Sequence, residues 1–216
     1  LVLIQFCGSL VYGMGAVYAA RRGLAAADVA LFMGALLAGA MVMQWPLARL
    51  SDAIDRRWVL GSASVLAAAA AFFAASDQVE GVAFYAAAFV FGGFCLSQYS
   101  LVVALIHDHL RPSEITGVSG TIALLSGLVA VTGPYTIALV IERFGAASYF
   151  QVMGGLLVLM ALFSFWRLLT IPALPRRYKT ASTLQAPVAS IGTVLHPQDK
   201  APLTAAQDAS DAGGTG

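Results

Sequence analysis

The chain has 216 residues, of which 59% are hydrophobic and 11% are charged, and its formal net charge is +1. A soluble domain is about half apolar and a quarter charged, so this composition excludes an ordinary soluble fold, and the small net charge gives no sign of a nucleic-acid partner. Both cysteines, Cys7 and Cys95, lie inside apolar runs, so we expect neither a disulfide framework nor a zinc site.

Six windows meet the requirement of a membrane-spanning helix, which needs about 20 predominantly apolar residues. They cover residues 1–20, 28–48, 57–76, 81–106, 114–141 and 147–170. We therefore predict an all-α membrane protein with six transmembrane helices over residues 1–170. The chain begins inside the first window without a methionine or a signal peptide, so we also expect that further sequence precedes it.

The segment 171–216 is rich in Pro, Ala, Ser, Thr and Gly and has no sustained hydrophobic period. Such a segment cannot bury enough apolar surface to offset the entropy lost on ordering. We predict a disordered tail on the cytoplasmic side.

The orientation follows from the basic residues in the connectors, because cytoplasmic loops are enriched in Lys and Arg. One side of the predicted bundle carries Arg49, Arg56, Arg57, Arg111, Arg167, Arg176, Arg177 and Lys179, and the other carries Arg21, Arg22 and Arg143. The second and fourth connectors and the C-terminus are therefore predicted to be cytoplasmic. Arg21 and Arg22 count against this assignment.

The six windows divide into two triplets, and the middle helix of each carries a proline near its end. These are Pro46 in the second window and Pro134, preceded by Gly133, in the fifth. A proline inside a spanning helix frees backbone groups and is expected to kink the helix. Matched interruptions in two halves indicate inverted three-helix repeats, as in secondary transporters.

The second connector, "RLSDAIDRR" (residues 49–57), gathers acidic and basic groups between two apolar runs. Ser51 or Asp52 would suit a turn or the N-cap of the next helix, and Arg56 and Arg57 could pair with Asp52, with Asp55 or with lipid phosphate. A solvated turn that simply follows the positive-inside rule is the alternative.

Residues 48–57 resemble the loop motif of the major facilitator superfamily, G-x-L-x-D-[RK]-x-G-[RK]-[RK]. Leu50, Asp52, Arg56 and Arg57 match the motif, whereas Ala48 and Asp55 replace its glycines and Ala53 replaces its first basic residue. With the stretches "GFCLSQYS" and "LLSGLVAVTGPY", residues 1 to about 170 look like helices seven to twelve of a bacterial transporter in the YcaD-like branch of that family.

This resemblance implies a secondary transporter in the bacterial inner membrane that moves a small solute by alternating access. It implies a second six-helix half, N-terminal to this one, as the main partner. It also implies that Asp52 is the acid of a cytoplasmic latch with Arg56 and Arg57 as its basic partners and Arg49 auxiliary. In that family the helix engaged by the loop belongs to the other half.

Polar residues inside the spans are the candidates for a substrate cavity. Gln5, Ser9 and Tyr12 share one face of the first window, Ser97 and Ser100 share a face of the fourth beside Gln98 and Tyr99, and Thr116, Ser119 and Ser126 form a stripe on the fifth. We select Gln5, Ser9, Tyr12, Ser97, Gln98 and Ser119. The alternative is that such groups bond only to neighbouring helices, at about 0.6 kcal/mol each.

The interior of the predicted spans is free of Asp, Glu, Lys, Arg and His. A neutral or amphipathic solute suits such a lining, and a proton-coupling residue, which usually lies at depth, would then belong to the other half. No metal or cofactor is expected, because the run His107-Asp108-His109 supplies too few separated ligands.

Two other functions are weighed. The stretch "GVSG" around Ser119 matches the serine motif of rhomboid-type membrane proteases, but the three histidines, His107, His109 and His196, lie in a connector or in the tail, where none can act as base. An enzyme is therefore not expected. A membrane sensor or scaffold that transports nothing stays an alternative.

Overall fold

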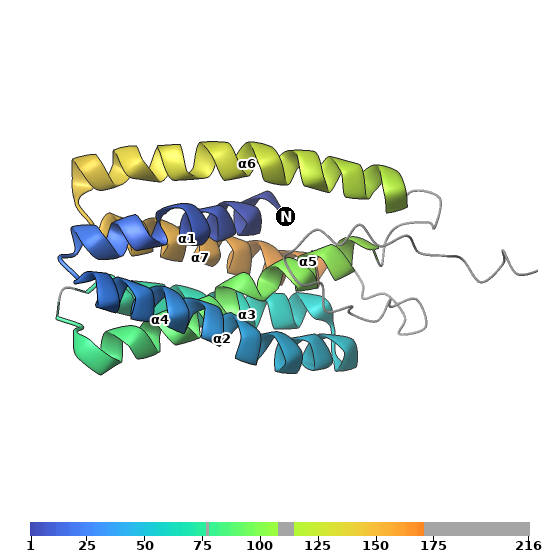
Figure 1. Cartoon of the computed structure of the whole chain (residues 1–216). Coiled ribbons are helices and arrows are strands. Elements are labelled where there is room, and N and C mark those ends of the chain that lie inside the picture. Colours follow the sequence, from blue (N-terminus) through green and yellow to red (C-terminus); the bar gives the residue numbers. More distant parts are fainter. Residues whose placement is uncertain (77, 108–114, 171–216) are drawn as a thin grey trace, which may run out of the picture. The chain divides into compact units, whose positions relative to one another are not determined.

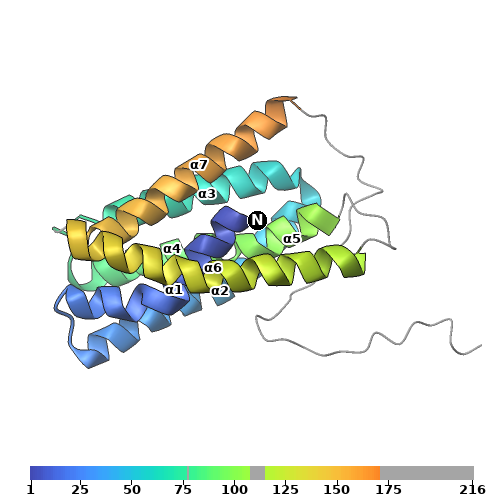
Figure 2. The ribbon, with the colours of Figure 1, turned by 90° about the horizontal axis from the view of Figure 1, so that it is seen from above.

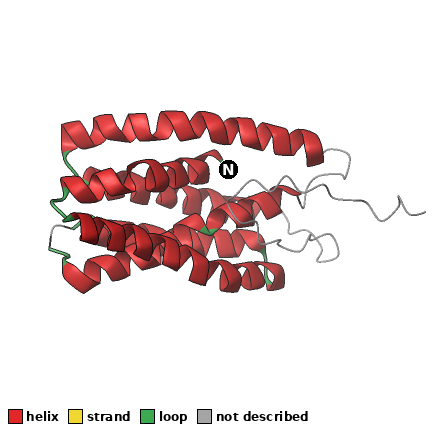
Figure 3. Cartoon of the chain, viewed as in Figure 1, coloured by secondary structure: helices red, strands yellow, loops and turns green. Residues whose placement is uncertain are grey.

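The computed structural model describes residues 1–76, 78–107 and 115–170, and every regular element in them is a helix (Figure 3). Several predictions fall on the rest of the chain. The tail with its basic residues, as well as Asp108, His109 and Arg111, lies outside the described residues, and so do the side chains of His107 and Thr116.

The described residues form seven helices, which are α1 (Val2–Arg21), α2 (Ala26–Ala53), α3 (Arg56–Ala74), α4 (Gly81–Leu96), α5 (Gln98–His107), α6 (Ile115–Phe144) and α7 (Ser148–Thr170). Together α4 and α5 make the fourth span, so six segments are long and apolar enough to cross a membrane. The predicted all-α fold with six spans is confirmed.

Successive spans run in opposite directions. The connections α1–α2, α3–α4 and α6–α7 lie at one end of the bundle, and the α2–α3 connection lies at the other, with the last turn of α7 (Figure 1). The described basic residues therefore divide as predicted: Arg49, Arg56, Arg57 and Arg167 are at one end, and Arg21, Arg22 and Arg143 are at the other.

Helices far apart in the sequence pack as long pairs. The most extensive contacts join α3 to α7, α2 to α4 and α1 to α6, and Figure 2 shows α3 beside α7 and α6 over α1. In the two triplets, α1 corresponds to α4, α2 to α6 and α3 to α7. When each helix is replaced by its counterpart, the α1–α6 pair becomes the α4–α2 pair, and the α3–α7 pair is unchanged. This is the pattern expected of two related three-helix repeats.

The α2–α4 pair is held together by direct contact between backbones. A Cβ atom added to Gly39 would overlap the carbonyl group of Phe89, and one added to Gly92 would overlap the backbone of Leu36. Helices in lipid associate through such close approach, because lipid tails remove most of the hydrophobic drive between them.

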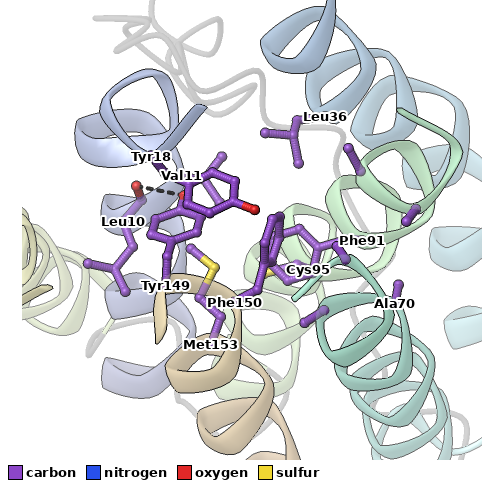
Figure 4. Packing of buried hydrophobic residues seen from close by; sticks show 14 of the residues in the cluster. Leu10, Val11, Tyr18, Leu36, Ala70, Phe91, Cys95, Tyr149, Phe150 and Met153 are labelled. Carbon is purple, nitrogen blue, oxygen red and sulfur yellow. Dashed lines mark hydrogen bonds between the residues drawn. The ribbon is translucent and has the colours of Figure 1, made fainter. Parts of the chain in front are cut away.

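A buried aromatic cluster joins α1 to α7 and α4 (Figure 4). Tyr18 and Tyr149 stack with their ring centroids 4.6 Å apart, and Phe150 meets Phe91 edge to face at 5.2 Å. The hydroxyl of Tyr149 donates to the carbonyl oxygen of Leu10 at 3.1 Å, so the polar tip of this buried ring is satisfied, as such groups require.

The charged connector differs from its prediction. Helix α2 continues to Ala53 and α3 begins at Arg56, so only Ile54 and Asp55 connect them. The expectation that Ser51 or Asp52 caps the next helix is wrong, because both lie in the last turns of α2. Asp55 has the extended backbone of an N-cap and accepts a hydrogen bond from the N–H of Arg57 at 3.0 Å.

Two other details concern helix continuity. The fourth span, predicted as a single helix, is divided into α4 and α5 at Ser97, which keeps helical backbone angles (φ −68°, ψ −18°), so Gly81–Ile106 still forms one span. Conversely, α2 and α6 run through Pro46 and Pro134 without a break, and kinks at these prolines and at Gly133 stay a prediction.

Candidate functional site

The predicted polar face of α1 is turned toward α6. Nε2 of Gln5 donates to Oγ of Ser126, which donates in turn to the carbonyl oxygen of Ile122 at 2.7 Å. One turn further along α1, Ser9 lies against α6 so closely that a Cβ atom on Gly133 would overlap its hydroxyl oxygen. The two helices thus meet along a polar seam.

Both ends of this seam carry exposed polar groups. Tyr12, next on the same face of α1, is 57% exposed. Ser119 is also exposed and lies two turns before Ser126 on α6. The structure therefore brings together Gln5, Ser9 and Ser126, with Tyr12 and Ser119 as accessible groups on the two helices.

The two candidates from the fourth span lie elsewhere. Oγ of Ser97 donates to the carbonyl oxygen of Ala40 on α2 at 3.3 Å. Gln98 is fully buried, and its Oε1 accepts a hydrogen bond from Oγ of Ser64 on α3 at 2.8 Å. These side chains face α2 and α3, so they do not share the seam between α1 and α6.

The charged loop forms a set of contacts at the predicted cytoplasmic end. Arg56 is 2% exposed and its Nη2 lies 3.3 Å from Oδ1 of Asp52, whose side chain is 42% exposed. Nη1 of Arg57 donates to the carbonyl oxygen of Arg167 at 3.2 Å and so ties α3 to the end of α7. A buried guanidinium needs such partners, because an unpaired buried charge is strongly destabilising.

Arg49, the auxiliary residue of the predicted latch, takes another position. Its guanidinium lies 3.9 Å above the ring of Trp45, one turn earlier on α2. Cation–π contacts of this kind stabilise exposed sites by about 0.5–1 kcal/mol.

Sequence reasoning missed Arg22, which organises the opposite end of the bundle. Its Nη1 donates to the hydroxyl of Tyr18 and to the carbonyl oxygen of Ala74, both at 2.9 Å, and its Nη2 donates to the carbonyl oxygen of Val79 at 2.7 Å. The sequence did contain a sign of this role, because Arg22 is one of the basic residues that count against the orientation predicted by the positive-inside rule.

Comparison with known proteins identifies related chains. The family model described as Major Facilitator Superfamily matches residues 1–205. A curated protein of Bacillus subtilis (strain 168), named "Uncharacterized MFS-type transporter YfkF", is 28% identical over 182 residues, which are 82% of this chain and 44% of that protein. The chain therefore spans less than half the length of this relative. No solved structure matches the chain.

Proposed function

We propose that this chain, which belongs to the major facilitator superfamily, is the C-terminal six-helix half of a secondary transporter and has no enzymatic role. The transporter moves a small solute by alternating access in the inner membrane of a bacterium. The observation that carries this proposal is the exchange pattern of the helix pairs, because inverted repeats are the basis of alternating access in such folds.

A second six-helix half is the proposed main partner. Only 17% of the apolar window of α2 and 22% of that of α6 are buried, against 56% for α3. These two helices therefore offer most apolar surface to other helices or to lipid. The relative that the chain matches is more than twice as long as the matched region, which leaves room for such a half.

The polar seam is the proposed wall of the substrate path, with Gln5, Ser9, Tyr12 and Ser119 as the groups that meet the solute. Apart from Asp28, near the start of α2, the charged residues of the described spans lie in the last turns or at the ends of the helices. A neutral or amphipathic solute therefore suits this half, and any proton-coupling group is assigned to the other.

Transport is tested in proteoliposomes that contain the complete gene product. Two neutral probes are used, labelled chloramphenicol as an amphipathic solute and labelled glucose as a polar one. We expect saturable counterflow of at least one of these uncharged probes. Specific binding of a probe without translocation would instead favour a sensor.

Asp52 is the proposed acid of the cytoplasmic latch, with Arg56 as its partner within the loop and a helix of the other half as its second contact. We expect Asp52→Asn to change the transport rate about tenfold, because a buried guanidinium loses its carboxylate partner. Asp55→Asn is the matched control, since it removes the same charge while Asn still caps α3. Equal effects of both variants would show that only the net charge of the loop matters and would contradict the proposed role of Asp52 in the latch.

A further inference from the structure

The two cysteines of the chain form a pair inside the protein. Cys7 lies on α1 and Cys95 on α4, and both belong to the buried cluster of Figure 4, in which Cys95 is labelled. The two residues are 1% and 2% exposed, and one thiol donates a hydrogen bond to the other. Two helices that are not neighbours in the sequence thus bring their sulfur atoms together.

This pair is not needed to hold the helices together. A thiol is a weak donor and a weak acceptor, whereas the stacked rings of Tyr18 and Tyr149 and the hydrogen bond from Tyr149 to Leu10 already join the helices of the cluster. A buried cysteine otherwise behaves as a small apolar residue. What two such core residues would not require is that their sulfur atoms face each other.

Two facing thiols are a ligand set for a soft cation. Soft sulfur ligands select soft metals, and a thiol loses its proton when it binds one. If a divalent cation binds, each sulfur forms one bond to the metal and two protons leave, so the bridge of two sulfur atoms and one metal is neutral. Neutrality matters at this place, because an uncompensated charge is costly in an apolar interior.

The number of ligands discriminates among divalent cations. Zinc in structural sites takes four protein ligands, and calcium and magnesium take oxygen ligands. The part of the chain that the structure describes contains no group of three or more His, Cys, Asp or Glu side chains that could hold a metal ion. The pair therefore suits a soft divalent cation that is satisfied by two sulfur atoms, and mercury(II) has this preference.

We infer that Cys7 and Cys95 form a two-coordinate site for mercury(II), in which one ion bridges α1 and α4. The ion enters as mercury(II) chloride, because a neutral molecule can pass the apolar surroundings of the site. Its two chloride ligands leave with the two thiol protons as the two bonds to sulfur form. The inference goes beyond transport, since it depends on neither the solute nor the direction in which the solute moves.

Retention of mercury by the complete gene product in detergent tests the site. The protein is loaded with mercury(II) chloride and washed with 2-mercaptoethanol at about 0.1 mM, far below the effective concentration of two thiols held in contact. Bound metal is measured by inductively coupled plasma mass spectrometry. The wild type should keep one ion per chain more than either Cys7→Ala or Cys95→Ala, because a single remaining thiol cannot compete with the wash.

Met153→Leu is the matched control. Met153 lies in the same buried cluster and also carries sulfur, but its thioether has no proton to exchange, so this variant should retain mercury as the wild type does. Size exclusion before loading shows that each variant is folded. The melting temperature should rise on loading only in chains that keep both cysteines, since a ligand that binds the folded state stabilises it.

A further measurement needs no variant. X-ray absorption at the mercury edge of the loaded and washed wild type should show two sulfur neighbours. Three or more sulfur neighbours would contradict the two-coordinate geometry, and so would zinc that is retained through the same two cysteines.

Loss of the extra ion in both cysteine variants, with retention in Met153→Leu, supports the site. Equal retention by the wild type and both cysteine variants would overturn the inference. Loss in only one of the two variants would also overturn it, because the ion would then be bound by a single reactive thiol.

Discussion

At the scale of single residues, Arg22 shows how one side chain can join several segments. Its guanidinium reaches the ends of α1 and α3 and the connector to α4, and it also lies 4.4 Å from the centroid of the Phe84 ring. The carbonyl groups at a helix C-terminus lack partners within the helix and carry partial negative charge. At the C-terminus of α3, Arg22 supplies both hydrogen-bond donors for the carbonyl groups and a positive charge opposite their partial negative charge.

We predict that Arg22→Ala lowers the free energy of unfolding by about 2–4 kcal/mol, because several charge-assisted hydrogen bonds are lost and carbonyl groups are left unpaired. The melting temperature in detergent, followed by scanning fluorimetry, measures the effect. Arg21→Ala is the control, since Arg21 is exposed and its loss should change stability by no more than about 0.5 kcal/mol. Equal melting temperatures for both variants would contradict the role of Arg22 as a cap of α3.

Gln5 and Ser126 allow the two interpretations of a polar residue in a span to be separated. If Gln5 contacts the solute, Gln5→Leu should lower the transport rate about tenfold, while Ser126→Ala, which frees the amide, should retain transport. A bond that only joins α1 to α6 would contribute about 0.6 kcal/mol, and both variants would then behave alike. Initial rates in proteoliposomes distinguish these results.

At the scale of helices, the α2–α4 pair depends on residues without side chains. Gly39 and Gly92 let the two backbones touch, and the clash of an added Cβ atom with a backbone carbonyl cannot be relieved by a rotamer change. The same applies less severely to α1 and α6, where an added Cβ on Gly13 would meet the ring of Pro134. These points of close approach fix the distance between the two helices of each pair and so determine how the helices pack along their whole length.

We predict that Gly39→Ala destabilises the bundle by about 2 kcal/mol or more, since overpacking against backbone forces helices apart. Gly34→Ala, on the same helix, is the matched control because nothing lies within 4 Å of its added Cβ. That variant should be neutral or more stable by about 0.5–1 kcal/mol, as alanine favours helix over glycine. Melting temperature and yield after size exclusion measure both.

At the scale of the whole molecule, sidedness follows from where charge can be placed. Of the basic residues in the helices that the structure describes, Arg49, Arg56, Arg57 and Arg167 lie at one end of the bundle, and Arg21, Arg22 and Arg143 lie at the other. The exception at the second end has a structural reason, because the charge of Arg22 is used in the cap of α3.

We predict that the C-terminus is cytoplasmic, as the positive-inside rule indicates, and that green fluorescent protein fused to it therefore fluoresces in bacteria. Alkaline phosphatase fused after Gly145, in the α6–α7 connection, should be active, since that connection is placed outside. Fusion after Ile54 is the control and should be inactive. The reverse pattern would show that the orientation is the opposite of the predicted one and would contradict a cytoplasmic latch.

The sequence by itself determined the number of spans, their approximate limits and the polar face of Gln5, Ser9 and Tyr12. These depend on local hydrophobic length and on the helical period, which the bilayer enforces for each segment separately. The sequence did not identify Asp55, rather than Asp52, as the N-cap of α3. Several residues in that connector suit a helix start, and a pattern of hydrophobic residues does not fix a helix end to the single residue.

Only the tertiary structure decided what the remaining polar groups do. The partner of Gln98 is 34 residues away, and the carbonyl groups bound by Arg22 are more than 50 residues away, so neither pairing leaves a periodic trace in the sequence. The hydrogen bond of Ser97 likewise requires a carbonyl group of α2, 57 residues away. Which way a helix faces is set by its neighbours, through close backbone contact and the pairing of buried polar atoms.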